Sequence, residues 1–402
     1  MMQPVLPPAC YTEQGWFDRE QEKIFGKLWL LAGLTQQLQA ENDFIVRNFS
    51  GVPVLIQNAG GTLRAFRNAC AHRGMPIQIA DCGNRRLVCP YHGWSYNGDG
   101  QLRGIPNEKI YGLCKKEQAN LKLHSYAVET VGNFVFVNLS DDPLPITEQF
   151  SDDLLLLLRE VSPHFAPEVS YSTFTGHYNW KLNFENILDW NHFQFVHRQS
   201  LAPLLEFEGD GGPGEPLTQH SPFFRPGSAL ADVRFSRGGP PAESVRLKDL
   251  SIIKRYAMPY RRRWFAKLLD RTLDPGAFFD CNIFPNVNFG SIHGEHFYLQ
   301  QFVPTAPDRV EYHSWVFTAR LKDGVPPQPH LLWGIHHAEK GVVDEDVVLF
   351  NALQKALESA STIGVMGDHE TSITAIGHWY KRHLTEENAR NVLMAGDGSH
   401  HP

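Results

Sequence analysis

The chain has few cysteines and no long apolar run. Its 402 residues include only six cysteines, too few for a disulfide-dense secreted scaffold. The longest apolar stretches, 24–34 and 154–158, fall short of the ~20 residues that a membrane-spanning helix needs. Residues 1–21 lack the apolar core of a secretory signal. These absences predict a soluble cytoplasmic protein with no membrane segment.

A surplus of basic charge is also missing. The 37 Lys and Arg residues are outnumbered by 44 Asp and Glu residues, and the net charge is −7. Proteins that bind nucleic acid through its phosphates are usually basic, which disfavours nucleic acid as a partner. The Gly-rich fingerprint of a dinucleotide-binding loop is absent as well, which disfavours a nicotinamide-binding domain in this chain.

What the sequence does have is a globular composition, with 42% hydrophobic residues over a length that predicts two domains. Residues 11–34 have the spacing of an amphipathic helix, within an N-terminal helical segment at 1–40 that we expect to pack on the last domain. Strand pairs bounded by Gly and Asn turns then predict an all-β domain at 41–145. The pairs are 52–57 with 62–68, 91–96 with 101–103, and 126–128 with 133–138.

The remainder, 146–402, mixes helical and strand periods and is predicted to be an α+β domain. A Gly- and Pro-rich stretch at 209–241 predicts a long loop. The expected helices are 152–161, 183–196 and 344–361, and the expected strands are 173–180, 297–303 and 311–318.

Two short motifs each pair a cysteine with a histidine. They are Cys70-Ala71-His72 and Cys89-Pro90-Tyr91-His92, each followed by a glycine within two residues. Two thiolates and two imidazoles suit zinc or an iron–sulfur cluster. Zinc sites usually pair Cys with Cys and His with His, whereas here each half supplies one of each. This favours a Rieske [2Fe–2S] centre, with a zinc site as the alternative.

A second constellation lies about a hundred residues downstream. Asp189, His192 and His197 have the spacing Asp-x-x-His-x-x-x-x-His. Two neutral imidazoles and one carboxylate on one face of an octahedron form the non-haem Fe(II) arrangement that activates O₂. On an ideal helix the two histidines would diverge by about 140°, so the helix must distort or end between them. The alternative is a pair of ordinary core histidines.

The two motifs in this order resemble the catalytic (α) subunit of the Rieske non-haem iron oxygenases, the aromatic-ring-hydroxylating family. The resemblance implies a Rieske β-domain followed by an α+β catalytic domain, whose antiparallel sheet is surrounded by helices. Met75 and Tyr91 stand where respiratory Rieske proteins carry extra disulfide cysteines. The implied cluster ligands are Cys70, His72, Cys89 and His92, and two of the implied ligands of the mononuclear iron are His192 and His197.

The third iron ligand of the family is a carboxylate near a C-terminal helix. Placing Gln354 on the matching glutamine of the family pattern puts Asp346 at the ligand position, with Asp344 and Glu345 as alternatives. Asp189 matches the family's bridging aspartate. It would join His192 of one subunit to the cluster ligand His92 of its neighbour, which implies a ring-shaped trimer, with or without a small β subunit.

The resemblance implies an oxygenase that hydroxylates an aromatic compound, with aromatic acids among the candidates. Electrons would come from NAD(P)H through a separate reductase, with or without a ferredoxin. A basic cluster at 254–271 could dock an acidic ferredoxin or bind a substrate carboxylate, or could be a solvated loop. One alternative is hydroxylation or oxidative N-demethylation of a quaternary ammonium compound in an aromatic cage. The alternative of another class is a Rieske electron carrier without oxygenase activity.

Overall fold

The computed structural model describes residues 5–49, 51–150, 152–189, 192–197, 200, 267–269, 278–292, 295–360, 364–367 and 370–385. The chain divides into two compact units. One is Phe25–Leu144, which we call the β unit, and the other is Met1–Ile24 with Pro145–Pro402, which we call the α+β unit. The expected loop at 209–241 and most of the basic cluster at 254–271 lie outside the described residues.

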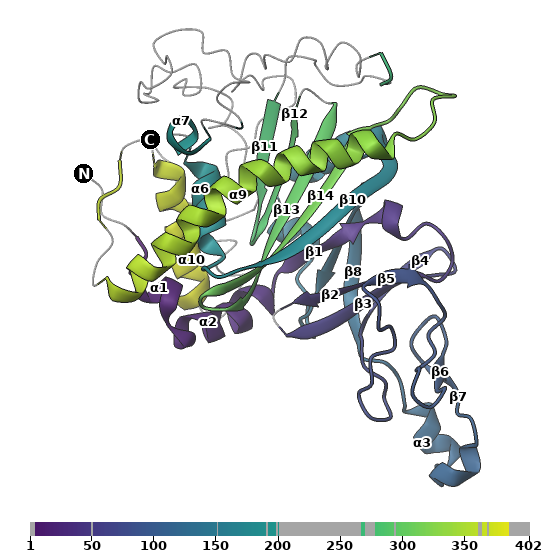
Figure 1. Cartoon of the computed structure of the whole chain (residues 1–402). Coiled ribbons are helices and arrows are strands. Elements are labelled where there is room, and N and C mark those ends of the chain that lie inside the picture. Colours follow the sequence, from purple (N-terminus) through teal and green to yellow (C-terminus); the bar gives the residue numbers. More distant parts are fainter. Residues whose placement is uncertain are drawn as a thin grey trace. The chain divides into compact units, whose positions relative to one another are not determined.

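The β unit holds a seven-stranded antiparallel sheet in the order β1-β9-β8-β4-β3-β2-β5, together with a small β6-β7 hairpin (Figure 1). All three expected hairpins are confirmed by the pairings β3 with β4, β6 with β7, and β8 with β9. The strands are β1 (Trp29–Leu34), β2 (Asp43–Phe49), β3 (Val52–Ala59), β4 (Thr62–Arg67), β5 (Cys82–Asn84), β6 (Ser95–Tyr96), β7 (Leu102–Gly104), β8 (Ser125–Val131) and β9 (Phe134–Asn138). Short helical segments lie at Glu108–Tyr111 and α3 (Lys115–Ala119).

The expected helix at 11–34 is wrong at its C-terminal end. The chain is helical in α1 (Ala9–Thr12), α2 (Gln14–Glu20) and a π-helical turn at Gln21–Phe25, and then becomes strand β1. Every residue of β1 is buried, so the strand shows no alternation of polar and apolar residues. An apolar run of this kind cannot be told from a buried helix by its period. The β unit therefore begins at Phe25, whereas the sequence placed that boundary at residue 41.

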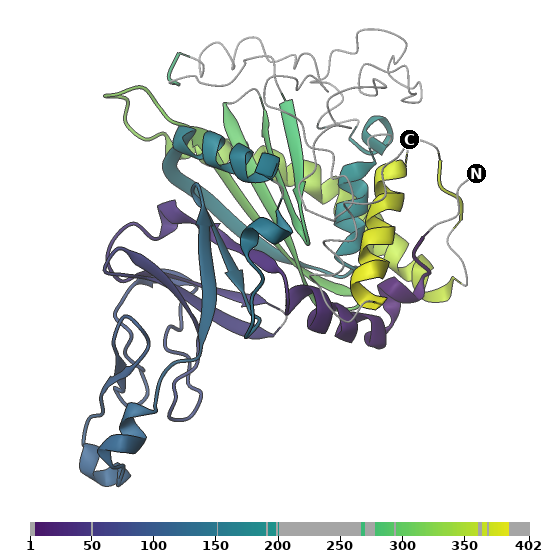
Figure 2. The ribbon, with the colours of Figure 1, turned by 180° about the vertical axis from the view of Figure 1, so that it is seen from behind.

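The α+β unit is built on a five-stranded antiparallel sheet in the order β10-β14-β13-β12-β11. Helix α9 crosses one face of this sheet in Figure 1, and α5 lies in front of the other face in Figure 2. The fold class expected from the sequence is therefore confirmed. The strands are β10 (Phe165–Gly176), β11 (Phe278–Ile283), β12 (Val287–Ile292), β13 (His296–Ala306) and β14 (Arg309–Ala319). The helices are α4 (Ile146–Gln149), α5 (Asp152–Val161), α6 (Lys181–Leu188), α7 (Phe193–Val196), α9 (Pro329–Ser359) and α10 (Thr371–Thr385).

Two helices differ from the sequence expectation in ways that matter for the site. The helix expected at 183–196 is two helices, because Asp189 leaves the helical conformation and ends α6. Helix α9 begins at Pro329, well before the expected start at residue 344, so Asp346 lies near its middle. Among the described residues, no helix has both the length and the apolarity that crossing a bilayer requires.

Candidate functional site

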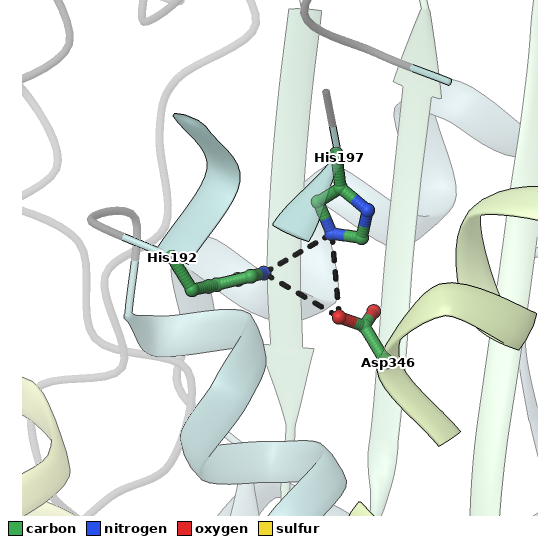
Figure 3. A group of neighbouring side chains, drawn as sticks. All are labelled: His192, His197 and Asp346. Atoms are coloured by element: carbon green, nitrogen blue, oxygen red, sulfur yellow. Dashed lines mark hydrogen bonds and ion pairs between the residues drawn. The ribbon is translucent and has the colours of Figure 1, made fainter. Parts of the chain in front are cut away.

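Three side chains of the α+β unit converge on one point. His192 and His197 flank the single turn of α7, and Asp346 reaches them from α9 (Figure 3). The two Nε2 atoms lie 3.2 Å apart, and Asp346 Oδ1 lies 3.3 Å from His197 Nε2 and 3.8 Å from His192 Nε2. Because α7 is only four residues long, the two imidazoles meet despite their five-residue spacing. The structure thus brings together three ligand types that the sequence singled out.

The hydrogen bonds behind the two imidazoles determine which nitrogens carry protons. His197 Nδ1 lies 2.8 Å from the Glu345 carboxylate, and His192 Nδ1 donates to the main-chain carbonyl of Asp189. Each ring therefore places its proton on Nδ1 and leaves a lone pair on Nε2. The Asn186 amide nitrogen, which can only donate, lies 3.2 Å from His192 Nε2 and agrees with this tautomer.

Burial keeps both imidazoles neutral. It lowers the pKa of His192 to about 4. It also lowers the pKa of His197, although the hydrogen bond and the charge of Glu345 partly offset this shift. Burial raises the pKa of Asp346 to about 7. Asp346 Oδ1 is buried and accepts no hydrogen bond from the described residues. Burial thus disfavours the charge of Asp346 beside two neutral imidazoles, and a cation between the three side chains would stabilise the ionised carboxylate.

The donor set fits a six-coordinate metal. Ligand atoms about 2.1 Å from a metal at right angles lie roughly 3 Å from one another, close to the three separations observed. Two imidazoles and one carboxylate on one face match the triad that non-haem Fe(II) uses, with three positions left open. The residues present therefore fit mononuclear iron.

The two alternatives to Asp346 have other partners. Asp344 is exposed and pairs with Lys340 one helical turn away, at 2.6 Å. Glu345 contacts His197 on its Nδ1 side, opposite to the nitrogen that faces Asp346, and also accepts from Ser200 Oγ at 2.6 Å. The geometry therefore favours Asp346 as the third ligand and makes Glu345 the carboxylate behind His197. Sequence reasoning missed this role of Glu345, because adjacent helical residues point about 100° apart and nothing local shows which one faces the histidines.

The two Cys-His motifs form matching loops in the β unit. In each loop the cysteine N–H bonds to a carbonyl five residues on, of Met75 or Trp94, at 2.8 Å. A glycine with positive φ closes each turn: Gly74 at 71° and Gly93 at 70°. An L side chain is strained in that conformation, which explains the glycine after each motif.

The candidate ligands in these loops differ in burial. Cys70 and Cys89 are buried, and they are close enough for the neighbouring thiol, together with burial, to raise the pKa of Cys70. The rings of His72 and His92 are half-buried and lie 4.8 Å apart between centroids. Tyr96 Oη lies 3.0 Å from Cys70 Sγ. Two buried thiols and two half-buried imidazoles fit the ligand set of a Rieske [2Fe–2S] cluster.

Asp189 lies where α6 ends. Its main-chain carbonyl holds His192, and its side chain lines a cavity of about 240 Å³ that Glu185, Asn186 and Glu370 also line. Glu185 is half-buried there and accepts a 2.5 Å hydrogen bond from Tyr11 Oη. Burial raises the pKa of Glu185 to about 7. The bridging role expected of the Asp189 side chain involves a second subunit and stays a prediction.

Two families match the chain. Residues 28–126 match the Rieske [2Fe-2S] domain, and residues 165–386 match the catalytic domain of the ring-hydroxylating alpha subunit. The glycine betaine monooxygenase oxygenase subunit of Pseudomonas aeruginosa is 33% identical over 205 residues, which are 50% of this chain and 47% of the relative. The corresponding subunit of Chromohalobacter salexigens is 25% identical over 380 residues, 89% of this chain and 80% of the relative. The chain thus spans about half the length of the first of these relatives.

Two solved structures share the fold at 18% identity and a TM-score of 0.68. One is the quaternary ammonium Rieske monooxygenase CntA in complex with L-carnitine, with 96% of each chain covered. The other is naphthalene 1,2-dioxygenase with indole bound, with 99% of this chain and 96% of that chain covered. Because the catalytic-domain match takes in more than half of the residues, the chain belongs to the family of ring-hydroxylating alpha subunits, with a Rieske [2Fe-2S] domain at its N-terminal side.

Proposed function

We propose that the chain acts in the cytoplasm as the oxygenase component of a multicomponent system, which uses O₂ and NAD(P)H-derived electrons to hydroxylate a small organic substrate. The observation that carries this proposal is the convergence of His192 Nε2, His197 Nε2 and Asp346 Oδ1, with their lone pairs facing one another. A site of this kind binds a metal on one face only and leaves room for O₂ and substrate on the other.

The family's cofactors, a [2Fe–2S] cluster and a mononuclear iron, each have a matching ligand set in the chain. We assign the cluster to Cys70, His72, Cys89 and His92, and the iron to His192, His197 and Asp346. When bound, the cluster supplies single electrons and the iron supplies the activation of O₂. Glu345 and the Asp189 carbonyl orient the two imidazoles, and Asn186 lies beside the metal-facing nitrogen of His192.

Electron delivery in this proposal needs other proteins and a second copy of the chain. A reductase, with or without a ferredoxin, would reduce the cluster. The Asp189 carboxylate would then link His192 to His92 of a neighbouring subunit, in a homotrimer that a small β subunit could complete. Support comes from the position of Asp189, three residues before His192 and directly hydrogen bonded to it through its carbonyl. A carboxylate between two ligand imidazoles would give a short hydrogen-bonded route between the metals.

For the substrate, an aromatic compound such as an aromatic acid is the first candidate, in line with the family's ring-hydroxylating catalytic domain. A quaternary ammonium compound is the second candidate, and the two glycine betaine monooxygenase relatives favour it specifically. The fold does not separate the two, because the structures related to each class match equally well.

Iron stoichiometry tests the proposal against the electron-carrier alternative. Purified protein, reconstituted with Fe(II) and sulfide, is analysed for iron and acid-labile sulfide. The proposal expects three irons and two sulfides per chain, whereas a Rieske carrier without a catalytic centre would hold two of each. A zinc-stabilised protein would be colourless and would contain no labile sulfide.

A further inference from the structure

One polar residue from each of five strands lies on a single line across the sheet of the α+β unit. Each is the direct register partner of the next, from β11 to β10. We call these residues the polar row: Asn282, Asn288, Gln300, Ser314 and Ser172. Asn288 Nδ2 donates to Asn282 Oδ1 at 3.3 Å, and both side chains are buried. Hydrogen-bonding groups thus extend across the full width of a sheet whose inner positions would ordinarily be apolar.

The polar row lies on the sheet face that α9 covers (Figure 1). Ser172 Oγ lies 3.0 Å from Nε2 of His336 on α9, and Ser170 Oγ lies 2.6 Å from Nδ1 of the same ring. On β13, His296 Nε2 lies 3.2 Å from the Glu339 carboxylate of α9. Side chains alternate along a strand, so residues two apart share a face. Gln300 therefore faces α9 together with His296.

The opposite face of the same sheet is an apolar core. One residue along from the polar row, Phe289, Leu299 and Trp315 are register partners and are fully buried. Phe165 packs there against Phe297, with ring centroids 4.8 Å apart. This face is therefore largely apolar, and its buried polar exceptions are Ser291 and the register partners Gln301 and His313.

Two side chains in the middle of the polar row are free to hydrogen bond to a ligand. Gln300 and Ser314 are half-buried, although they lie on inner strands of the sheet. Neither side chain hydrogen bonds to another residue in the described part of the chain. Neither residue is among those with buried unpartnered polar atoms, so the polar atoms of both side chains are open to solvent and available to a ligand.

The polar row adjoins the candidate iron centre. Tyr312 precedes Ser314 by two residues, so it lies about 7 Å away on the same face. Tyr312 is buried, and its pKa is raised well above the usual range chiefly by burial, with the nearby charge of Asp346 contributing. Its ring packs between Phe174 and Phe302, at centroid distances of 4.7 and 5.2 Å. An aromatic band therefore separates the metal ligands from the polar row.

We propose that the polar row binds a hydrogen-bonding group of the substrate, while the apolar part of the substrate lies over the aromatic band next to the iron. This inference rests on the proposed oxygenase function and narrows its substrate class. Amide and hydroxyl side chains both donate and accept, so they match a carboxylate, amide, carbonyl or hydroxyl group. The substrate is then a small polar molecule, and an unsubstituted hydrocarbon is a poor ligand because it would displace water from Gln300 and Ser314 without replacing the hydrogen bonds.

The test uses the full chain loaded with cluster and iron, reduced and exposed to nitric oxide, and followed by EPR. The polar probes are benzoate, anthranilate and glycine betaine, and the hydrocarbon probes are toluene and naphthalene. Each probe is titrated for its perturbation of the ferrous-nitrosyl signal. We expect at least one polar probe to bind, and to bind more tightly than either hydrocarbon. Gln300→Leu should weaken that binding about tenfold, equivalent to ~1.4 kcal/mol, with a smaller loss for Ser314→Ala.

Thr318→Val is the matched control. Thr318 pairs with His296 on the same face, four residues along each strand from the row partners Gln300 and Ser314, and its replacement should leave probe binding unchanged. The unperturbed nitrosyl signal of each variant reports whether the fold and the iron centre survive. Tighter binding of a hydrocarbon, no binding of any polar probe, or unchanged binding in both row variants would overturn the inference. Absence of the nitrosyl signal before any probe is added would instead overturn the proposed function.

Discussion

The Glu345 carboxylate lies 2.8 Å from Nδ1 of His197, on the side of the imidazole that points away from Asp346. This contact fixes the tautomer of the ring and aims its Nε2 lone pair at the metal site. A carboxylate in this place also makes the imidazole more basic and hence a better ligand. The sequence offered Glu345 as an alternative iron ligand, and its contact with His197 Nδ1 favours a supporting role instead.

Replacing Glu345 should weaken iron binding without removing a ligand. We expect Glu345→Leu to lower the affinity for Fe(II) by about 10- to 100-fold, the usual effect of losing a partner behind a ligand. Glu345→Gln keeps an oxygen acceptor and should therefore lose less affinity for Fe(II). Competition with a chelator measures the affinity directly. The control is Asp344→Asn, at an exposed neighbour paired with Lys340. Loss of iron in the control, with Glu345→Leu unaffected, would mean that the wrong carboxylates have been assigned.

His192→Ala should separate the two metal sites. This variant removes one of three ligands of the mononuclear iron and touches none of the four cluster ligands. We expect about one iron per chain to be lost, while the visible absorption and EPR spectra of the reduced [2Fe–2S] cluster persist. Loss of the cluster spectrum with retention of the mononuclear iron would show that the two sites have been confused.

Asp189→Ala should interrupt electron transfer while leaving both metals in place. The main-chain carbonyl of residue 189, which holds His192 Nδ1, is retained in this variant, so the iron ligand keeps its orientation. The carboxylate that would reach the neighbouring subunit is lost. We expect full iron and sulfide content and a reducible cluster, but no product from a single turnover. Turnover at the wild-type rate would exclude the bridging role.

Stability should fall as the pH rises through the titration range of Glu185. Burial raises the pKa of this carboxyl from 4.5 to about 7, so the folded chain holds a proton that the unfolded chain has lost. The stabilisation is fully present below about pH 4.5 and is lost as the pH passes 7. The difference corresponds to an upper limit on the order of 3 kcal/mol. The midpoint temperature of thermal unfolding should fall more steeply between pH 5 and pH 8 in the wild type than in Glu185→Gln. Parallel profiles would count against a buried neutral Glu185.

Local motifs predicted much of the site. Cys70 and His72, or His192 and His197, lie within a few residues of one another, so their spacing alone indicates metal chemistry. Asp346 is different, because 149 positions separate it from His197, and it was found only through the family resemblance. The distinction between Asp346 and Glu345 depends on how α9 is rotated against the sheet, and the composition of the helix does not show that rotation.

Other features depend on contacts that no local pattern reports. Strand β1 (Trp29–Leu34) was taken for helix because all of its residues are buried and it shows no period of two. The early start of α9 was missed because this part of the helix contains Pro329, Gly334 and Gly341, residue types that are disfavoured within helices. The polar row could not be predicted at all, since it exists only in the register of five strands that come from two distant stretches of the chain, 165–176 and 278–319.

The central claim is that the chain carries a mononuclear iron site open to O₂, in addition to its cluster. The most direct measurement is the EPR spectrum of the reduced, iron-replete wild-type protein exposed to nitric oxide, which stands in for O₂ and needs no reductase. We predict a ferrous-nitrosyl signal of one spin centre per chain, absent from His192→Ala and from Asp346→Ala. A protein that shows its full cluster signal and no ferrous-nitrosyl signal would contradict the account, and would leave an electron carrier in its place.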